Sequence, residues 1–417
     1  MSAPAPRHAA VIGGGIVGLS IALALQARGV GVTLYDAGGD RAPASEGNAG
    51  HIAVEQHEPL ASLAMVRSLP RRLMVLGGPA SFPPGATAQW LPFGLRLLRA
   101  ARPARFAEGK RALGALLADA LPAWRRSMGD VGRPDLLREQ GNVVAWESVA
   151  GAKRGRAALA GYESPVARWR DLTGEEARML SAQLRAAPAD AVRFDGSASV
   201  ADPAAALGAL RTAFLARGGS LQARAATVAD ARRAGADLTV VAAGVRSAAL
   251  MRELGHATPM IAERGYHIQS DVTRWPLELT SVVFEERALV ATRFLTGLRA
   301  TSFIEFTRPD APPDARKWDR LRAHAEALGL AFDSPPRTWI GSRPTLPDYL
   351  PAIGRSTHDP RVLYAFGHHH LGLTLGPVTG ELVAALACAD EVAPDLAPFS
   401  VDRFRRGRPA RPRAKLG

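Results

Sequence analysis

The apolar and polar positions at the start of the chain predict a strand, a turn, a helix and a second strand. Residues 8–12 are mostly apolar, a glycine turn follows, and the apolar pattern then continues almost without charge to residue 27. A further apolar stretch over residues 30–35 ends at the carboxylate of Asp36. Short apolar runs bounded by glycine are typical of buried parallel strands, and the longer run between them suits a buried helix. The pattern therefore predicts a βαβ unit with Asp36 at the end of its second strand.

The remainder of the chain predicts a helical region, a strand-rich region and a final strand–helix pair. Residues 56–130 have a mainly helical pattern that is interrupted at Pro83 and Pro84. Other elements are expected as strands over 136–147, 220–228, 238–244 and 362–366, as several strands within 256–306, and as helices over 202–217 and about 377–389. Residues 342–354 are rich in proline and glycine and are expected to form an irregular crossing. We therefore expect an α/β fold with a second, strand-rich sheet.

Composition indicates an ordinary globular chain with room for two or three domains. The 417 residues are 47% hydrophobic and 22% charged, and a chain of this length can bury a large core. The single cysteine, Cys388, excludes an internal disulfide and a cysteine-based zinc or iron–sulfur site.

The net charge of +13 raises the question of a nucleic-acid or membrane partner. Arginine supplies nearly all of the basic residues, alongside abundant alanine, proline and glycine, which is typical of a GC-rich coding bias. The basic residues gather at 96–111 and at 403–415. The second group predicts a solvated, poorly ordered basic tail over 401–417. We expect no nucleic-acid partner.

Two apolar segments bear on localisation. The first, at 8–27, is long enough to be mistaken for a membrane span, but its glycine turn argues against one, and no other stretch is expected to span a membrane. Residues 1–6 lack the basic region of a signal peptide, so we expect a cytoplasmic protein. The second segment, 87–95, precedes Arg96, Arg99, Arg102 and Arg105. It predicts either a helix that caps the active site, which we favour, or a peripheral contact with the inner face of a membrane.

Gly13, Gly15 and Gly18 have the G-x-G-x-x-G spacing of a dinucleotide-binding turn between a strand and a helix. Gly13 permits the tight turn, Gly15 leaves the backbone open to a pyrophosphate, and Gly18 allows close helix–strand packing. The pyrophosphate would lie at the helix N-terminus, where unpaired N–H groups and the helix dipole favour negative charge. Asp36 suits the ribose hydroxyls and repels a 2′-phosphate, which argues against NADP and leaves FAD and NAD open.

Two later segments, 238–247 and 339–380, look like returns to the sheet of the N-terminal unit. A nicotinamide-binding domain is usually contiguous in sequence. Returns from the C-terminal part of the chain therefore favour a flavoprotein.

Three segments together resemble the D-amino-acid oxidase superfamily of FAD enzymes, with bacterial D-amino-acid dehydrogenases as the nearest resemblance. The first is the glycine fingerprint continuing into Ser45, Asn48, Ala49 and Gly50. The second is the run 241–247. The third comprises Trp339, Gly341, Arg343, Pro344, Thr345, Pro347, Asp348, Pro351, Ile353 and Gly354, followed by 367–376.

The resemblance implies two domains in an α/β chain that is α+β overall. A Rossmann-like FAD-binding domain is expected over 1–60, 190–255 and 335–400. A second, antiparallel-sheet substrate domain is expected over 61–189 and 256–334.

The resemblance also implies roles for individual residues. Arg343 is expected to bind the substrate carboxylate, and Tyr266 and His370 are expected to contact the substrate. The expected cofactor-binding residues are Gly13, Gly15, Ile16, Val17, Gly18, Asp36, Ser45, Asn48, Ala49, Gly50, Thr227, Ala243, Gly244, Gly341, Gly367, His369, Leu371, Gly372, Leu373 and Thr374. Residues 368–374 are expected to form a loop over the flavin, and Thr227 to present its backbone to the adenine from a strand. No metal is expected.

Physical arguments support the role of Arg343 and leave alternatives elsewhere. A guanidinium matches a carboxylate bidentately, and hydride transfer from a neutral amine needs orientation more than an acid or base. The alternative for Arg343 is a structural ion pair with Asp348 or Glu305. The alternative for Tyr266 and its neighbour His267 is packing within a strand.

Four histidines stand out at the expected flavin site. Three consecutive histidines at 368–370 cannot all face one ion, which rejects zinc. They form either a tight loop whose backbone matters or a direct ring contact with the substrate or flavin. His51 departs from the family pattern and offers a remote alternative, a flavin attachment point.

We therefore expect FAD-dependent dehydrogenation of a D-amino acid, or of a cyclic amine acid such as D-proline or hydroxyproline, with a quinone or carrier as electron acceptor. Three alternatives stay open. One is a glycine- or sarcosine-type amine oxidase that releases peroxide. The second is a flavoprotein that acts on modified tRNA, which only the net charge supports. The third is a non-catalytic flavin-binding subunit of a larger complex.

Overall fold

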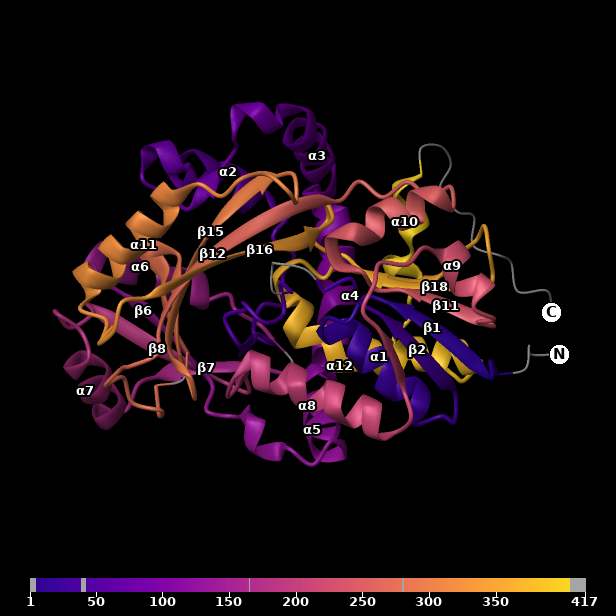
Figure 1. The fold of residues 1–417 in the computed structure, drawn as a ribbon. Helices are drawn as coiled ribbons and strands as arrows, with labels where there is room; N and C mark the ends of the chain where they lie inside the picture. Colours follow the sequence, from indigo (N-terminus) through magenta and orange to yellow (C-terminus); the bar gives the residue numbers. More distant parts are fainter. Residues whose placement is uncertain (1–4, 39–42, 165, 280, 406–417) are drawn as a thin grey trace.

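The computed structural model describes residues 5–38, 43–164, 166–279 and 281–405, which are organised around two sheets (Figure 1). The first sheet has the strand order β10-β2-β1-β11-β18-β17. These strands are β10 Ser220–Gln222, β2 Gly31–Tyr35, β1 His8–Ile12, β11 Leu238–Val241, β18 Val362–Phe366 and β17 Ala352–Arg355. All neighbours are parallel except β17, which pairs antiparallel with β18. The N-terminal unit and both expected returns thus share one sheet.

Helices cover both faces of this sheet because its strands are apolar on both sides. Val11 packs in the core with helix α1 (Ile16–Gln26) and helix α12 (Gly372–Cys388), whereas the next residue, Ile12, packs on the opposite face. That opposite face is covered by α9 (Val228–Arg233) and α10 (Ser247–Glu253). The arrangement is a doubly wound α/β layer.

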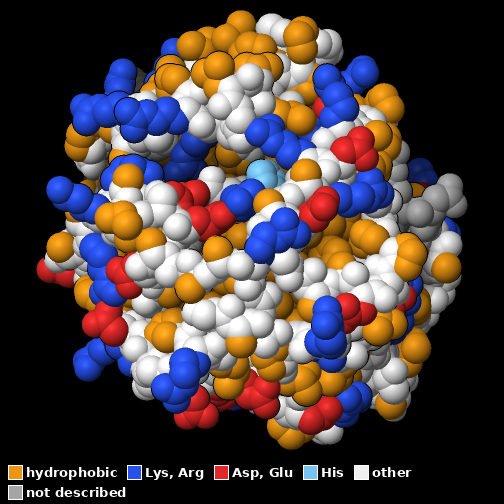
Figure 2. Space-filling model, turned by 90° about the vertical axis from the view of Figure 1, so that its left-hand side faces the viewer, with side chains coloured by type: hydrophobic (Ala, Val, Ile, Leu, Met, Phe, Trp, Pro, Cys, Tyr) orange, Lys and Arg blue, Asp and Glu red, His pale blue; other side chains and the backbone are white. Residues whose placement is uncertain are grey.

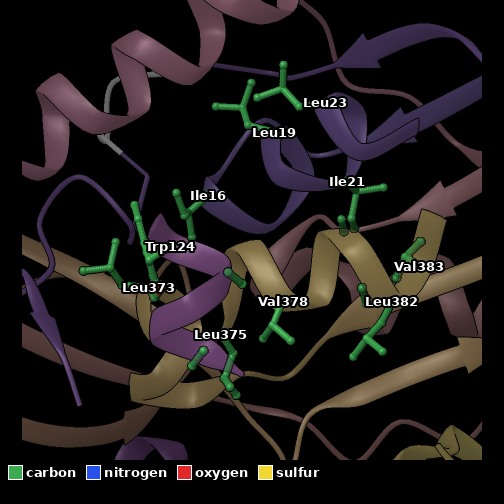
Figure 3. Close-up of a cluster of buried hydrophobic side chains, with 14 of the residues drawn as sticks. Ile16, Leu19, Ile21, Leu23, Trp124, Leu373, Leu375, Val378, Leu382 and Val383 are labelled. Atoms are coloured by element: carbon green, nitrogen blue, oxygen red, sulfur yellow. Dashed lines mark hydrogen bonds between the residues drawn. The ribbon is translucent and has the colours of Figure 1, made fainter. Parts of the chain in front are cut away.

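Helices α1 and α12 lie against one another in the largest core cluster, where α5 (Ala120–Asp130) joins them (Figure 3). A Cβ added at Gly380 of α12 would lie 2.6 Å from the backbone of Ser20, so only glycine allows this approach. The segment His369–Cys388 is long and apolar enough to span a membrane, which the sequence interpretation missed, but 78% of its most apolar window is buried inside the protein. Its burial is that of a core helix.

Helix α12 begins five residues earlier than predicted, and Pro377 lies inside it. Proline has no N–H, so the carbonyl of Leu373, four residues before it, receives no bond from that position of the helix. The indole Nε1 of Trp124 donates to this carbonyl at 3.0 Å. The indole N–H of Trp124 on α5 thus replaces the missing proline N–H, so the helix can start before Pro377 rather than at it.

The second sheet is mixed and largely antiparallel, with the order β16-β12-β15-β14-β13-β6-β8-β7 and β4 beside β15. Its strands are β4 Ala80–Ser81, β6 Asn142–Trp146, β7 Arg168–Asp171, β8 Asp190–Asp195, β12 Ile261–Ser270, β13 Ser281–Phe284, β14 Leu289–Phe294, β15 Gly297–Thr307 and β16 Arg337–Thr345. Helices α6 (Val149–Leu159), α7 (Gly174–Ala182) and α11 (Ala315–Leu328) lie beside it, on the left of Figure 1. A three-stranded sheet of β3 His51–Ile52, β9 Ala198–Val200 and β5 Leu137–Arg138 completes the strands.

Four further helices are α2 Leu63–Arg72, α3 Thr87–Ala100, α4 Pro103–Ala118 and α8 Pro203–Ala216. The helical character of 56–130 is thereby confirmed. Helix α3 packs Phe93 and Leu97 toward Phe306 of the second sheet. Helix α4 instead contributes Leu113, Leu116 and Leu117 to the core around α1 and α12.

Sheet membership differs from the expected domain boundaries at two points. Strands β8 and β16 belong to the second sheet, although 190–255 and 335–400 were assigned to the cofactor domain. The apolar pattern of a strand does not say which neighbour it pairs with, because pairing is decided by contacts far away in sequence.

Three local expectations also change. The strand expected over 220–228 ends at Gln222, and Thr227 is instead the N-cap of α9. The crossing expected over 342–354 is partly regular, since β16 runs to Thr345. In the expected basic tail, Val401 is buried and Arg403 pairs with Asp348 at 2.7 Å, so Val401–Phe404 is packed against the protein. Residues 406–417 lie outside the described part of the chain.

Candidate active site

A cavity of about 2290 Å³ lies where the carboxyl ends of β1, β2 and β11 meet the second sheet. It is lined by the turn before α1, by residues 43–49, by the turn after β11, and by parts of β12, β16 and the histidine run. The segments on which the sequence prediction was based therefore line one cavity.

The N-terminus of α1 opens into this cavity. Gly15 is the N-cap, it makes no side-chain capping bond, and the first turn has no acidic residue. The backbone N–H of Ile16 donates to Ser45 Oγ at 3.2 Å. No carboxylate of the helix's own first turn therefore neutralises the positive end of the dipole, and this end fits the pyrophosphate of a dinucleotide.

Each glycine of the fingerprint has a distinct structural reason. Gly13 has a φ of 115°, and a Cβ there would lie 2.3 Å from the carbonyl oxygen of Ala242. A Cβ at Gly18 would lie 1.8 Å from the carbonyl oxygen of Gly13. A Cβ at Gly15 would meet only Ser45 Oγ, at 3.4 Å. Gly13 and Gly18 are thus needed for the fold, whereas Gly15 keeps the space in front of the helix N-terminus open.

Asp36 follows β2 directly and lines the same cavity, so it can accept hydrogen bonds from ribose hydroxyls. Its Oδ1 accepts from the backbone N–H of Gly38 at 3.1 Å. A Cβ at Gly14 would lie 2.2 Å from Asp36 Oδ2, so the middle glycine of the turn makes room for the carboxylate.

Most of the expected cofactor residues line the cavity. They are Gly13, Gly15, Ile16, Val17, Asp36, Ser45, Asn48, Ala49, Thr227, Ala243, Gly244, Gly341, His369, Gly372 and Leu373. Five do not reach it: Gly18, Gly50, Gly367, Leu371 and Thr374.

The residues that miss the cavity support its walls instead. Thr374 is buried and its Oγ1 accepts from the N–H of Ala53 at 3.0 Å. Leu371 belongs to the core. The loop expected over 368–374 is in fact a 3₁₀ turn, His369–Leu371, that leads directly into α12. This is why only some of its residues face the cavity.

Arg343 lies on β16 and lines the cavity. Its Nη1 donates to Glu263 Oε1 at 3.1 Å. The expected alternative partners are engaged elsewhere, because Asp348 binds Arg403 and Glu305 binds Arg264.

The hydrogen bonds of Arg343 within the described residues use Nη1 alone. A Cβ at Gly265 would lie 2.4 Å from Arg343 Nη2, so this glycine makes room for the guanidinium. Nε and Nη2 therefore remain as a fork that can take a carboxylate.

Tyr266 does not line the cavity, and the expectation of a substrate contact is wrong. The ring is fully buried and packs edge-on against Phe303 and Trp318. The hydroxyl donates to Glu305 Oε2 at 2.8 Å, and burial raises its pKa. Glu263, Arg264 and Gly265 line the cavity, whereas Tyr266 is not a lining residue and its hydroxyl points to Glu305.

The three consecutive histidines have separate environments. His368 Nε2 lies 3.1 Å from Thr379 Oγ1, and His369, at a φ of 42°, packs edge-on against Tyr349. His370 is half-buried at the cavity, with its Nδ1 2.9 Å from that of His369. Burial lowers the pKa of His368 and of His370 to about 3, so both rings are neutral at pH 7.

His267, which neighbours Tyr266, serves packing as well. Its ring stacks on Trp339, and its Nδ1 lies 3.0 Å from the carbonyl oxygen of Gly47. Burial lowers its pKa to about 3.

The sequence interpretation missed two groups of polar residues at this cavity. Glu263 was not singled out, because only the β12–β16 register brings it to Arg343. Glu55 and His57 were not singled out either, and they join His51 in the cavity wall. The available signal was the occurrence of His51, Glu55 and His57 within a few residues of the Asn48-Ala49-Gly50 turn.

Comparison with known proteins agrees with this geometry. The profile of the DAO family, described as FAD dependent oxidoreductase, matches residues 8–386. A D-amino-acid oxidase of Bradyrhizobium diazoefficiens is 31% identical over 96% of this chain and 100% of its own. D-amino acid dehydrogenase 2 of Pseudomonas aeruginosa is 29% identical over 91% of this chain and 94% of its own.

Solved structures show the same fold at lower identity. Iminodiacetate oxidase from Chelativorans sp. BNC1 has a TM-score of 0.69 at 18% identity, over 94% of this chain and 98% of its own. Glycine oxidase from Geobacillus kaustophilus has a TM-score of 0.66 at 21% identity, over 96% of this chain and 100% of its own. The predicted fold class, cofactor and superfamily are confirmed. The chain therefore belongs to the DAO family and is an FAD-dependent oxidoreductase.

Proposed function

We propose that this enzyme dehydrogenates a D-amino acid, or a related cyclic amine acid such as D-proline or hydroxyproline, at Cα. Bound FAD supplies the hydride acceptor. An acyclic substrate gives an imino acid that water converts to a 2-oxo acid and ammonia, and a cyclic secondary amine gives a cyclic imine. The observation that carries the proposal is Arg343, which lines the cofactor cavity and whose Nε and Nη2 make no hydrogen bond within the described residues.

The residues around Arg343 support an orienting role. Glu263 is buried and accepts from Arg343, from Thr345 Oγ1 at 3.1 Å and from the Tyr349 hydroxyl at 2.9 Å. These bonds fix the carboxylate of Glu263, which in turn fixes the guanidinium plane. A fixed fork sets the direction of Cα–H, and orientation of this kind can supply much of the rate.

The full-length relatives with D-amino-acid oxidase and dehydrogenase activity in their names favour the D form. The similar folds of glycine oxidase and iminodiacetate oxidase support a second candidate, an oxidase of a small achiral amine acid that releases peroxide. Comparison of flavin reduction by D-alanine with reduction by glycine and sarcosine distinguishes the two substrates, and peroxide release during turnover distinguishes an oxidase from a dehydrogenase.

Replacement of Arg343 by lysine tests the proposed anchor. Lysine keeps the charge and loses the fork, so flavin reduction should fall by roughly 10- to 100-fold or more while FAD content is unchanged. Wild-type reduction kinetics in this variant would refute the proposal.

We propose a quinone or an electron carrier as the electron acceptor. We also propose that the enzyme is cytoplasmic and reaches this acceptor through a peripheral contact with the inner face of the membrane. Helix α3 does not line the cavity, so the favoured idea that residues 87–95 cap the active site is not supported. It exposes Leu91, Leu95 and Leu98, and Val75 and Leu76 nearby are 88% and 69% exposed. Figure 2 shows apolar side chains gathered along the top of the molecule, over α2 and α3, with basic side chains beside them.

An apolar surface bordered by arginines suits an anionic lipid surface. Co-sedimentation with anionic vesicles, and its loss in a Val75→Ser, Leu76→Ser variant, tests the contact. Retention on RNA at low salt that vanishes at high salt would instead favour the tRNA alternative.

A further inference from the structure

One wall of the cavity carries a buried polar cluster with no assigned role. His51, Glu55 and His57 line the cavity, and they are only 8%, 8% and 4% exposed. His51 Nε2 lies 3.3 Å from Glu55 Oε1, and Ser197 Oγ donates to Glu55 Oε2 at 2.5 Å. Burying a carboxylate is unfavourable unless it is paired, so a charge retained here calls for a reason.

Hydrogen bonds with the protein backbone do not explain why the charge of Glu55 is buried here. Glu55 follows the short strand β3 and is not itself part of a sheet. His57 Nδ1 and the Tyr162 hydroxyl bond to the backbone carbonyl of Glu55 rather than to its carboxylate. The side chain of Glu55 is thus held only by His51 and Ser197 within the described residues.

Unused hydrogen-bonding capacity remains in the cluster. Nε2 of His57 is buried and has no hydrogen-bond partner within the described residues, and the buried Nε2 of His51 has only the 3.3 Å contact to Glu55 Oε1. Glu55 Oε1 meets only the long contact to His51. The cluster therefore keeps acceptor sites in the cavity that a donor from a ligand would satisfy.

Arg343 and His370 line the same cavity as the cluster. Both the positive charge of Arg343 and the negative charge of Glu55 act on His370, which is itself neutral. A small molecule in this cavity therefore has access to a cationic group, Arg343, and to an anionic group, Glu55. An amino acid carries that pair of charges, since its carboxylate is negative and its ammonium positive.

We propose that Glu55, positioned by His51, is the subsite for a substrate ammonium group. The proposal rests on the amino-acid oxidation proposed above. Arg343 takes the carboxylate and Glu55 takes the cation. An ammonium group at Cα gives one proton to the Glu55 carboxylate before the neutral amine loses hydride from Cα. The substrate can offer this ammonium group at Cα or at the end of a basic side chain, and different substrates distinguish these two sources.

The test compares Glu55→Gln with wild-type holoenzyme in flavin reduction by D-alanine and by D-lysine. We expect at least a 10-fold loss of reduction efficiency. A loss for both substrates assigns the α-ammonium, and a loss for D-lysine alone assigns a side-chain ammonium. Unchanged efficiency with both substrates would overturn the proposal.

A carboxylate without an amine separates binding from folding. Propionate needs only Arg343, so its affinity, read from the flavin spectrum, should be the same in Glu55→Gln as in wild type. An equal loss of propionate and amino-acid binding would mean that Glu55 only supports the wall, and would overturn the proposal.

Glu139→Gln is the matched control, because it makes the same substitution at a carboxylate that pairs with Arg125 and does not line the cavity. It should retain most of the activity toward both amino acids. If wild type is reduced by no amino acid at all, the proposed function itself fails. If wild type is reduced and Glu55→Gln matches it, only the subsite fails.

Discussion

Glu263 stands directly opposite Arg343 in the antiparallel register of β12 and β16, and its carboxylate holds Nη1 of the guanidinium at 3.1 Å. The pair spans 80 residues of sequence. The other edge of the guanidinium faces the cavity. One strand pairing therefore gives the arginine a carboxylate partner and also sets its orientation.

Glu263→Gln should therefore weaken orientation more than folding. The amide keeps the shape but loses the charge-assisted bond, and reduction efficiency should fall by roughly 10- to 100-fold. Stopped-flow flavin reduction measures it. Asp348→Asn, which breaks the pair with Arg403 outside the cavity, is the control and should leave reduction close to wild type.

Gly15→Leu should yield folded protein with little flavin. A Cβ at this position meets only Ser45 Oγ, at 3.4 Å, so the chain can fold, but the larger side chain extends into the space for the pyrophosphate. The ratio of flavin to protein absorbance measures the loss. Gly208→Ala, with open space around its Cβ, should keep its flavin, and a fully loaded Gly15→Leu would show the site to be misassigned.

Trp124→Phe should destabilise the protein by roughly 2–4 kcal/mol, through lost volume and an unpaired carbonyl at Leu373. Pro377→Ala in the same chain should recover about 1 kcal/mol, because the alanine introduced there supplies the missing helix N–H. Denaturant unfolding of both single variants and the double variant gives the coupling energy. A coupling near zero would show that the indole bond does not compensate for the proline.

Acidification should destabilise the protein through its buried histidines. The pKa of His368 and of His370 is lowered from 6.5 to about 3 in the folded protein. These rings take up protons on unfolding, so the free energy of unfolding should decline as the pH falls from about 6.5 toward 3. His368→Gln should flatten this slope relative to the exposed His358→Gln. An identical slope in both variants would contradict the assignment.

The cofactor site could be predicted from local sequence, because the motifs that identify it have short spacings. Gly13, Gly15, Gly18 and Asp36 act within one βαβ unit, and Arg343 stood out in a recognisable motif. A close approach of two backbone segments and a helix N-terminus without a side-chain cap both favour glycine, which is visible in the sequence.

Residues whose role depends on distant pairing could not be found in this way. Glu263 reaches Arg343 only through the strand register. Tyr266 turns away from the cavity next to an irregularity between Arg264 and Tyr266 in the pairing of β12 with β15, and strand alternation in the sequence does not locate such a shift.

Anaerobic flavin reduction by the two enantiomers of one amino acid tests the central claim most directly. With the carboxylate on Arg343 and Cα–H directed at the flavin, exchanging the enantiomer exchanges the amine and the side chain, which a buried site discriminates by roughly 100-fold or more. We predict rapid bleaching by the D form and slow bleaching by the L form. Equal rates with both enantiomers, or rapid bleaching by the L form alone, would contradict this prediction.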